Sequence, residues 1–291
     1  MEKDIIVISD LHIGDGGSRD NFGHPGSNKA EQLSLFLDYV SEQNGELIIL
    51  GDLFEFWQAN FSKVIVNNLP LLDRLAQHKL IYILGNHDSD LKYFKDTKLL
   101  SHNFFKKIEE PFSKNIGGKK FYFMHGHEID PANKGDSPGI GRAASIIAGI
   151  AEDHFGPNIG DKSTETLLLH FWETFKSVMQ ALWQSACEGG GDIDFTKTKE
   201  LLSPAQNPKF ASEMLLHYKD HREKEKYDIA VVGHTHKPGC MDNWYFNSGS
   251  WATSDNNFIR ITSEGKVQVF DWINGQPVES NTVLFLPEHS K

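Results

Sequence analysis

The chain of 291 residues lacks the features that would place it outside the cell or across a membrane. Its two cysteines, Cys187 and Cys240, are too few for a disulfide framework, which is typical of a reducing compartment. The longest nearly uninterrupted apolar stretch, Ala143–Ala151, is far shorter than the roughly 18 residues that span a bilayer. A strand-like apolar run begins close to Met1, so we expect no signal peptide. We predict a soluble, cytoplasmic protein.

Positive charge is also scarce. Lys and Arg total 29 against 40 Asp and Glu, which gives a formal net charge of −11. Binding to double-stranded nucleic acid needs clustered Lys and Arg, so we do not expect such a partner. Phosphate chemistry is not excluded, because bound divalent cations reverse the local field of a carboxylate-rich site.

Several short apolar runs are present, and each has the length and β-branched content of a buried strand. The runs are Ile5–Ile8, Glu46–Leu50, Leu80–Leu84, Phe121–Met124 and Ile229–Val232. Each is followed within a few residues by Asp, Asn or His, often across a glycine that permits a sharp turn. The carboxyl edge of an α/β sheet is where ligands bind, so we expect these polar residues to converge on one rim.

The residue types at this rim predict a site for two metals. Two close divalent cations need a bridging carboxylate together with neutral imidazole and oxygen ligands. We predict that one metal is held by Asp10, His12, Asp52 and His236, and the other by Asp52, Asn86, His125 and His234. The next residue, His87, is then available as a general acid toward the leaving oxygen. Asp88 is the candidate to orient His87 through a hydrogen bond to its ring, and Asn86 can also touch a phosphate.

The order of the predicted elements favours an α/β fold. Leu33, Phe36, Leu37 and Val40 have the spacing of an amphipathic helix between the first two strands. A second helix begins near Pro70, before the third strand. This alternation predicts right-handed crossovers and a parallel or mixed sheet. Toward the end of the chain, Trp244–Trp251 and Phe258–Trp272 alternate like antiparallel strands.

Helical periodicity replaces the strand pattern between residues 131 and 227. We therefore predict a domain formed by residues 1–130 and 228–291, with a helical insertion at 131–227. An aromatic stripe lies in this insertion at Trp172, Phe175, Met179 and Leu182. It is either a packing face or a lid for a substrate with an apolar part, and a lid could also contact a membrane peripherally.

The rim motifs resemble those of the calcineurin-like metallophosphoesterase superfamily. The matching segments are Asp10-Leu11-His12, Gly51-Asp52, Gly85-Asn86-His87-Asp88, His125 and Gly233-His234-Thr235-His236. The resemblance implies a four-layer α/β/β/α sandwich with a helical insertion and a binuclear metal centre. It also implies divalent cations, with manganese as the first expectation and iron or zinc as alternatives.

Three further features resemble the UDP-2,3-diacylglucosamine pyrophosphatase group of lipid A synthesis. They are Gly51–Trp57, the insertion that follows Phe123–Gly126, and Asn247–Trp251. This resemblance implies hydrolysis of a pyrophosphate bond, with acyl chains held against a helical cap. The chain has His87 where the best-known form has Arg, and His127 where that form has Asp.

We therefore predict a metal-dependent hydrolase of a phosphoric ester or anhydride, with a small, lipid-linked UDP-sugar as the first substrate candidate. A soluble phosphodiesterase or phosphatase acting on nucleotides is the alternative within enzymes. A metal-free scaffold for protein partners is disfavoured by the full set of metal-ligand types. His127 is either a substrate or supporting contact or an incidental neighbour of His125, and the sequence does not determine the oligomeric state.

Overall fold

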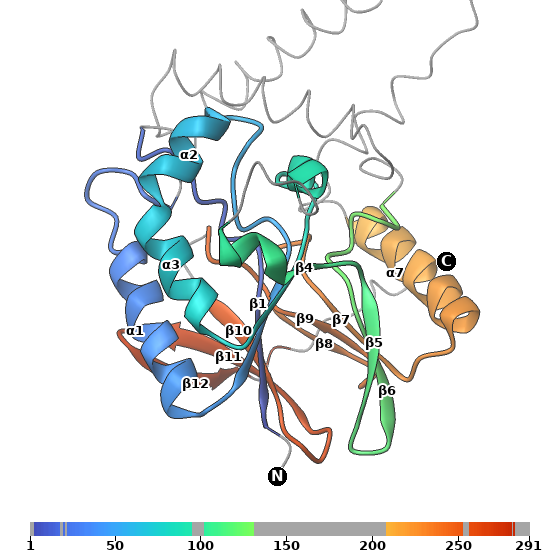
Figure 1. The fold of residues 1–291 in the computed structure, drawn as a ribbon. Helices are drawn as coiled ribbons and strands as arrows, with labels where there is room; N and C mark the ends of the chain where they lie inside the picture. The colour runs from blue at the N-terminus through green and yellow to red at the C-terminus, as the bar shows by residue number, and fades with distance from the viewer. Residues whose placement is uncertain are drawn as a thin grey trace, which may run out of the picture.

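The computed structural model describes residues 3–17, 20, 22–94, 102–130, 208–252, 256–280 and 282. Figure 1 shows that these residues form two β-sheets at the centre of the fold, with helices on the outer faces of the sheets. The following description concerns only these parts of the chain.

The first sheet is mixed and has seven strands. In spatial order they are β12 (Gln276–Ser280), β11 (Val267–Ile273), β10 (Asn257–Ile261), β1 (Ile5–Ile8), β2 (Glu46–Leu50), β3 (Leu80–Ile83) and β4 (Ile108–Glu109). Strands β1 to β4 are parallel, whereas β10 to β12 join the edge of β1 as antiparallel strands. The predicted mixed sheet is confirmed.

The second sheet has five strands. In spatial order they are β5 (Phe112–Ile116), β6 (Lys119–Phe123), β7 (Ile229–Val232), β9 (Tyr245–Asn247) and β8 (Gly239–Met241). Strand β9 is antiparallel to β8 but parallel to β7, so only part of the expected antiparallel pattern at Trp244–Trp251 is found. The chain leaves the sheet after Asn247, and the backbone N–H groups of Trp251 and Ala252 then donate to the carbonyl oxygen of Asp10.

Alternation along β1 explains how the layers pack. Ile6 and Ile8 face the helices on the outer side, whereas Ile5 and Val7 face the second sheet. Both faces of the strand are buried, which accounts for its uninterrupted apolar sequence. The outer layer consists of α1 (Lys29–Glu42), α2 (Phe61–Asn67) and α3 (Leu69–Gln77), followed by short 3₁₀ helices at Ser89–Phe94 and Asn103–Lys107.

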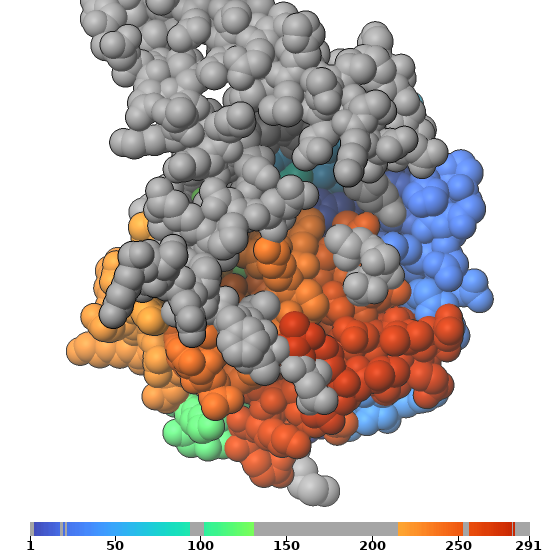
Figure 2. Space-filling view, turned by 180° about the vertical axis from the view of Figure 1, so that it is seen from behind, coloured from blue at the N-terminus to red at the C-terminus, as the bar shows by residue number. Residues whose placement is uncertain are grey.

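The predicted apolar face of the first helix is confirmed in α1, because Leu33, Phe36, Leu37 and Val40 are all buried. On the opposite side of the molecule, α7 (Pro208–Glu225) covers the second sheet. Leu215 and Tyr218 of α7 pack in one cluster with Trp244 and Tyr245. The layers are therefore α/β/β/α, as the resemblance implied. Figure 2 shows α7 in light orange at one side of the molecule and the C-terminal strands in red toward the other side.

The predicted helical insertion extends over residues 131–227, and 131–207 lie outside the described residues. Its domain boundary, its aromatic stripe and its role as a lid stay predictions. None of the described helices is long and apolar enough to cross a membrane.

Candidate metal centre

The predicted ligands come together where β1, β2, β3, β6 and β7 end. Several of them have left-handed backbone conformations that non-glycine residues rarely adopt. The φ angles are 55° at Asp10, 49° at His12, 50° at Asp52, 69° at His234 and 57° at His236. Each such residue costs on the order of 1–3 kcal/mol, and strain of this kind concentrates at functional sites. The backbone is therefore held at these positions by its surroundings.

The first group of potential ligands is Asp10, His12 and His236. Nε2 of His236 lies 3.1 Å from Oδ1 of Asp10 and 3.2 Å from Nε2 of His12. Nε2 of His12 lies 3.9 Å from Oδ1 of Asp10. Ligands bound to one cation at 2.0–2.2 Å are separated by roughly 3.0–3.5 Å, so the spacing suits a single ion with small adjustments.

The second group contains Asp52, Asn86, His125 and His234. Nε2 of His125 lies 3.2 Å from both Oδ2 of Asp52 and Oδ1 of Asn86. Asp52, His125 and His234 each offer one ligand atom, and these atoms lie within 4.8 Å of one another. Oδ2 of Asp52 also lies 3.8 Å from Nε2 of His12, so this carboxylate lies between the two groups.

Hydrogen bonds fix which imidazole nitrogen faces the centre. Nδ1 of His12 is 3.1 Å from Glu55, and Nδ1 of His125 is 2.6 Å from the carbonyl oxygen of Leu50. Nε2 of His234 is 2.7 Å from Asp130. The carbonyl and the ionised carboxylates only accept, so the histidine nitrogen donates in each case. In the neutral imidazole the other nitrogen then carries a lone pair, which is the usual arrangement of metal-binding histidines.

The two carboxylate oxygens of Asp10 have different surroundings. Oδ2 accepts hydrogen bonds from Oγ of Ser9 and, at 3.0 Å, from the backbone N–H of His234. Oδ1 is buried and accepts no well-aligned hydrogen bond from any described residue. A buried carboxylate oxygen of this kind requires a cation or another partner. The side chains present therefore fit a divalent metal.

The buried carboxylates of the centre create a negative field that favours positive charge nearby. Although burial raises it, the pKa of Asp52 is held well below its usual range by His125 and His87. Burial also raises the pKa of Asp10, and His236 and His125 outweigh that effect and lower it. Burial lowers the pKa of His125, but Asp52 and Asp10 raise it overall to about 10. The same carboxylate field would attract a divalent cation.

Close packing at two glycines is part of this construction. A Cβ at Gly85 would overlap Oδ1 of Asp52. A Cβ at Gly233 would lie 2.5 Å from Oγ of Ser9 and 2.6 Å from Oδ2 of Asp10. Only glycine lets these strand ends approach the carboxylates so closely.

His87 lies at the side of the first group and is held by two residues. Its Nδ1 is 2.7 Å from Oε2 of Glu55, and its ring stacks on Trp57 with centroids 3.8 Å apart. Burial lowers the pKa of His87, but Asp52 and Glu55 raise it overall, which favours a protonated ring. His87 also shares a group of possible ligand atoms with His12 and Asp52.

The expectation that Asp88 orients His87 is wrong, because Glu55 occupies that position. The Asp88 carboxylate points into the turns beneath, where it accepts hydrogen bonds from the backbone N–H groups of Gly85 and Leu53, both at 2.7 Å, and from the hydroxyl of Tyr82. Burial and the charge of Asp52 raise the pKa of Asp88 to about 6. Asp88 therefore ties the turn after β3 to the turn after β2.

Sequence reasoning missed Glu55 and Asp130. Glu55 is within the Gly51–Trp57 segment, three residues after Asp52, but nothing in the spacing indicates that it reaches two histidines. Burial raises its pKa, yet hydrogen bonds from His12 and His87 bring the pKa of Glu55 down to about 2. Asp130 follows His125 by five residues and has no sequence signal that points to His234.

His127 lies beside His125, with ring centroids 5.4 Å apart. Its Nδ1 is buried and has no hydrogen-bond partner among the described residues. Burial lowers the pKa of His127 to about 4, so the ring is neutral near pH 7. Among the other aromatic residues of the segment after Asp52, Phe54 and Phe56 pack into the core rather than at the centre.

A family model described as calcineurin-like phosphoesterase matches residues 3–238. A UDP-2,3-diacylglucosamine hydrolase from Blochmanniella pennsylvanica is 26% identical over 246 residues, which are 80% of this chain and 79% of that protein. One of the same name from Psychromonas ingrahamii is 29% identical over 136 residues, 44% of this chain and 49% of that protein. Among solved structures, Vps29 complexed with Zn+2 from Entamoeba histolytica is 12% identical, with a TM-score of 0.41, over 95% of this chain and 97% of that chain.

The family model covers far more than half of the chain and includes every predicted ligand from Asp10 to His236. Candidate ligand groups lie at the strand ends that carry those motifs. The protein belongs to the calcineurin-like phosphoesterase family and is a metal-dependent phosphohydrolase.

Proposed function

We propose that the protein binds two divalent cations, with Asp52 as the bridge, and hydrolyses a phosphoric ester or anhydride. The observation that carries the proposal is the position of one oxygen, Oδ2 of Asp52. It lies 3.8 Å from Nε2 of His12 in one ligand group and 3.2 Å from Nε2 of His125 in the other. Manganese is the first candidate, because the donor set mixes imidazole with carboxylate and carboxamide oxygens.

In this proposal Asp10, His12 and His236 complete one site, and Asn86, His125 and His234 complete the other. Two bound divalent cations would polarise the phosphoryl group and provide a nucleophile at neutral pH. The protein keeps the ligand nitrogens turned inward through Glu55, the carbonyl of Leu50 and Asp130. This preorganisation avoids rearrangement during the reaction.

We assign proton donation to His87. Its Nδ1 donates to Glu55 and its ring is fixed against Trp57, so Nε2 is left to protonate the departing oxygen. In the metal-free protein, burial lowers the pKa of His87, but Asp52 and Glu55 raise it overall, which favours a protonated ring. Asn86 would use its amide to hold a phosphoryl oxygen. Asp88 has only a supporting role, because it lies under the turns and does not contact His87.

The pyrophosphate bond of a UDP-diacylglucosamine-like molecule is the substrate that we propose. Two curated relatives carry the name UDP-2,3-diacylglucosamine hydrolase, which supports this choice. His87 is the main difference at the centre from the best-known pyrophosphatase pattern, and hydrolysis of a nucleotide phosphoester is the alternative outcome of the test.

The test combines metal analysis with a substrate panel. The purified protein is loaded with Mn²⁺, its metal content is measured, and initial rates are compared for an acylated UDP-sugar, bis-p-nitrophenyl phosphate and a cyclic nucleotide. We expect two metal equivalents per chain and a preference for the acylated UDP-sugar of at least about a hundredfold. Equal rates on all three would reject the substrate, and a content of one metal would reject the bridging role of Asp52.

A further inference from the structure

One oxygen of the Asp10 carboxylate is fully used by hydrogen bonds within the protein. Oδ2 accepts from the backbone N–H of His234 at 3.0 Å and from Oγ of Ser9. A carboxylate oxygen has two lone pairs, so these two donors occupy both of them. Oδ1 instead lies 3.1 Å from Nε2 of His236, within the first group of ligands. Asp10 therefore presents a single oxygen, Oδ1, to a cation at that group.

The direction of the hydrogen bonds at Ser9 follows from its neighbours. Its Oγ lies 2.7 Å from Oγ of Ser248, so one hydroxyl donates to the other. An ionised carboxylate only accepts, and each serine has a single hydroxyl hydrogen. Ser248 therefore donates to Ser9, and Ser9 donates to Asp10. The carbonyl oxygen of Val232, 3.1 Å from Oγ of Ser248, does not need this hydrogen, because it accepts the backbone N–H of Ser248 at 2.9 Å.

These two serines lie where water does not reach. Ser9, Asp10 and Ser248 are all 0% exposed. A Cβ at Gly233 would lie 2.5 Å from Oγ of Ser9, so the backbone just after β7 closes over this hydroxyl. Removal of the hydroxyl would leave Oδ2 of Asp10 with one donor and no solvent to supply a second.

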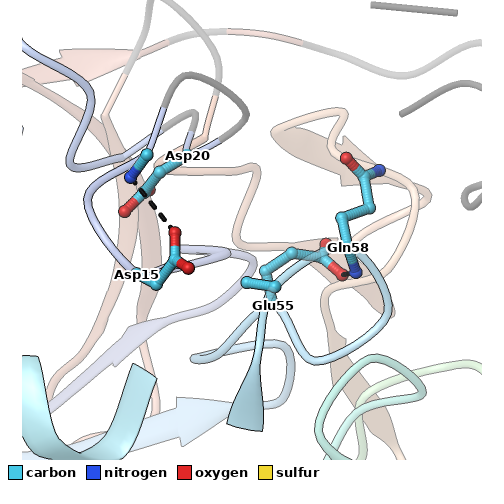
Figure 3. Close-up of a pocket in the computed structure, with 7 residues that line it drawn as sticks. Asp15, Asp20, Glu55 and Gln58 are labelled. Carbon is cyan, nitrogen blue, oxygen red and sulfur yellow. Dashed lines mark hydrogen bonds between the residues drawn. The ribbon is translucent and has the colours of Figure 1, made fainter. Parts of the chain in front are cut away.

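His12, another buried ligand of the first group, has a different kind of support. Its Nδ1 lies 3.1 Å from Glu55, and Glu55 lines a cavity of about 230 Å³ (Figure 3). Asp15 and Asp20 line the same cavity, whose volume is enough for several water molecules. Water can replace a hydrogen bond lost on this side, whereas it cannot replace one lost at Ser9. The first group therefore depends more on Ser9 than on its support from the cavity side.

We propose that Ser9 and Ser248 restrict Asp10 to binding through one oxygen, and that this restriction favours Mn²⁺ over Ca²⁺ at the first group. Ca²⁺ takes roughly six to eight oxygen ligands and often binds both oxygens of one carboxylate. A carboxylate limited to one oxygen disfavours Ca²⁺ more than a smaller cation that needs fewer ligand atoms. The inference rests on the proposed function, because it requires a cation at the first group. Ser9 acts through Asp10 and is a positioning residue.

The test is calorimetric titration of the metal-stripped, full-length protein with Mn²⁺ and, separately, with Ca²⁺. The variant His236→Ala identifies the binding step of the first group, because Nε2 of His236 contacts Asp10 and His12. Ser9→Ala should weaken that step about tenfold for Mn²⁺, as expected for loss of a supporting hydrogen bond, and much less for Ca²⁺. Ser248→Ala leaves the hydroxyl of Ser9 in place, so it should weaken Mn²⁺ binding only about threefold.

Ser250→Ala is the matched control. Ser250 is equally buried, but its Oγ donates at 3.0 Å to the backbone carbonyl oxygen of Asp10 rather than to the carboxylate. This substitution should lower stability in urea denaturation and leave the ratio of the Mn²⁺ and Ca²⁺ affinities unchanged.

Two outcomes would overturn the inference. One is a ratio of the two affinities that stays the same in Ser9→Ala, whether both affinities fall or neither does. The other is an equal change of this ratio in Ser250→Ala, because the effect would then come from the backbone of Asp10 and not from its carboxylate. Binding of fewer than two Mn²⁺ ions by the unmodified protein would overturn the proposed function instead.

Discussion

Two buried regions next to β1, one on its outer face and one at its carboxyl end, have opposite chemistry. Beneath α1, Phe36 packs against Trp251, Phe258 and Trp272 with ring centroids 5.0–5.2 Å apart. At the end of the same strand, Asp10 is equally inaccessible but faces other titratable groups. The aromatic cluster stabilises the fold, since it removes apolar surface from water.

The residues of the metal rim are also buried, but their burial does not remove apolar surface from water. Asp10 and Asp52 are buried carboxylates, and both have left-handed backbones. Such groups are costly unless they are paired, and here Asp52 pairs with His125 and Asp10 with His236, so the rim depends on these contacts to hold its shape. The comparison teaches that burial alone does not identify a stabilising residue, and that changes at the rim should affect metal binding and rate more than folding.

The largest effect is expected for Asp52→Ala. Loss of the shared carboxylate should lower turnover of bis-p-nitrophenyl phosphate by at least about 10³-fold and reduce the metal content below two equivalents. Metal analysis and circular dichroism of the same sample separate metal loss from unfolding. If the variant kept both metals and full activity, the assignment of Asp52 as the shared ligand of a catalytic centre would be wrong.

Phe36→Ala tests the other side of the comparison. The fully buried ring contacts three aromatic side chains, so its removal should lower the free energy of unfolding by about 3–5 kcal/mol. Urea denaturation measures this change, and kcat per folded molecule should stay the same. Leu35→Ala is the matched control, since Leu35 is 42% exposed and should change stability by less than about 0.5 kcal/mol.

His87→Ala should separate the chemical step from metal binding. We expect both metals to be retained, because Nδ1 of His87 is engaged by Glu55 and our proposal assigns His87 to neither metal. The rate should fall about 10²–10³-fold, as expected for loss of a general acid. Substrates with a good leaving group should lose less than those with a poor one, and an equal loss for both would reject proton donation by His87.

Asp130→Asn should weaken metal binding without removing a ligand. Asp130 holds Nε2 of His234 at 2.7 Å and is itself 1% exposed. Loss of such a supporting carboxylate typically weakens metal affinity by about 10–100-fold. Calorimetric titration with Mn²⁺ measures the affinity for the metal. The control variant Asp228→Asn, far from the centre, should leave this affinity unchanged.

The smallest effect concerns Glu46, at the opposite end of β2 from Asp52. Burial raises its pKa, but hydrogen bonds from Lys79 and Lys114 lower the pKa of Glu46 overall. Since the folded pKa lies below the unfolded one, this carboxylate stabilises the fold above the unfolded pKa of about 4.5 and loses that contribution as the pH falls through the folded value. Glu46→Gln should cost about 1 kcal/mol at pH 7. The thermal unfolding curves of the unmodified protein and of Glu46→Gln should converge in acid. A constant difference at all pH values would contradict a stabilising role of the ionised Glu46.

Much of the fold and the position of the metal centre could be predicted from local patterns of residues. Apolar runs such as Ile5–Ile8 fixed the central strands, because a strand buried on both faces leaves no room for polar residues. The spacing of Leu33, Phe36, Leu37 and Val40 fixed α1. The polar residues after each run indicated where ligands gather, since parallel strands present their carboxyl ends at one edge.

The side chains that support that rim could be identified only from the packed fold. Glu55 rather than Asp88 contacts His87, because the left-handed turn at Asp52 brings Glu55 beside His87 while Asp88 is drawn under the turns by Tyr82 and backbone N–H groups. Asp130 meets His234 across 104 positions of sequence. Contacts of this kind depend on loop conformation and distant packing, which local periodicity does not encode.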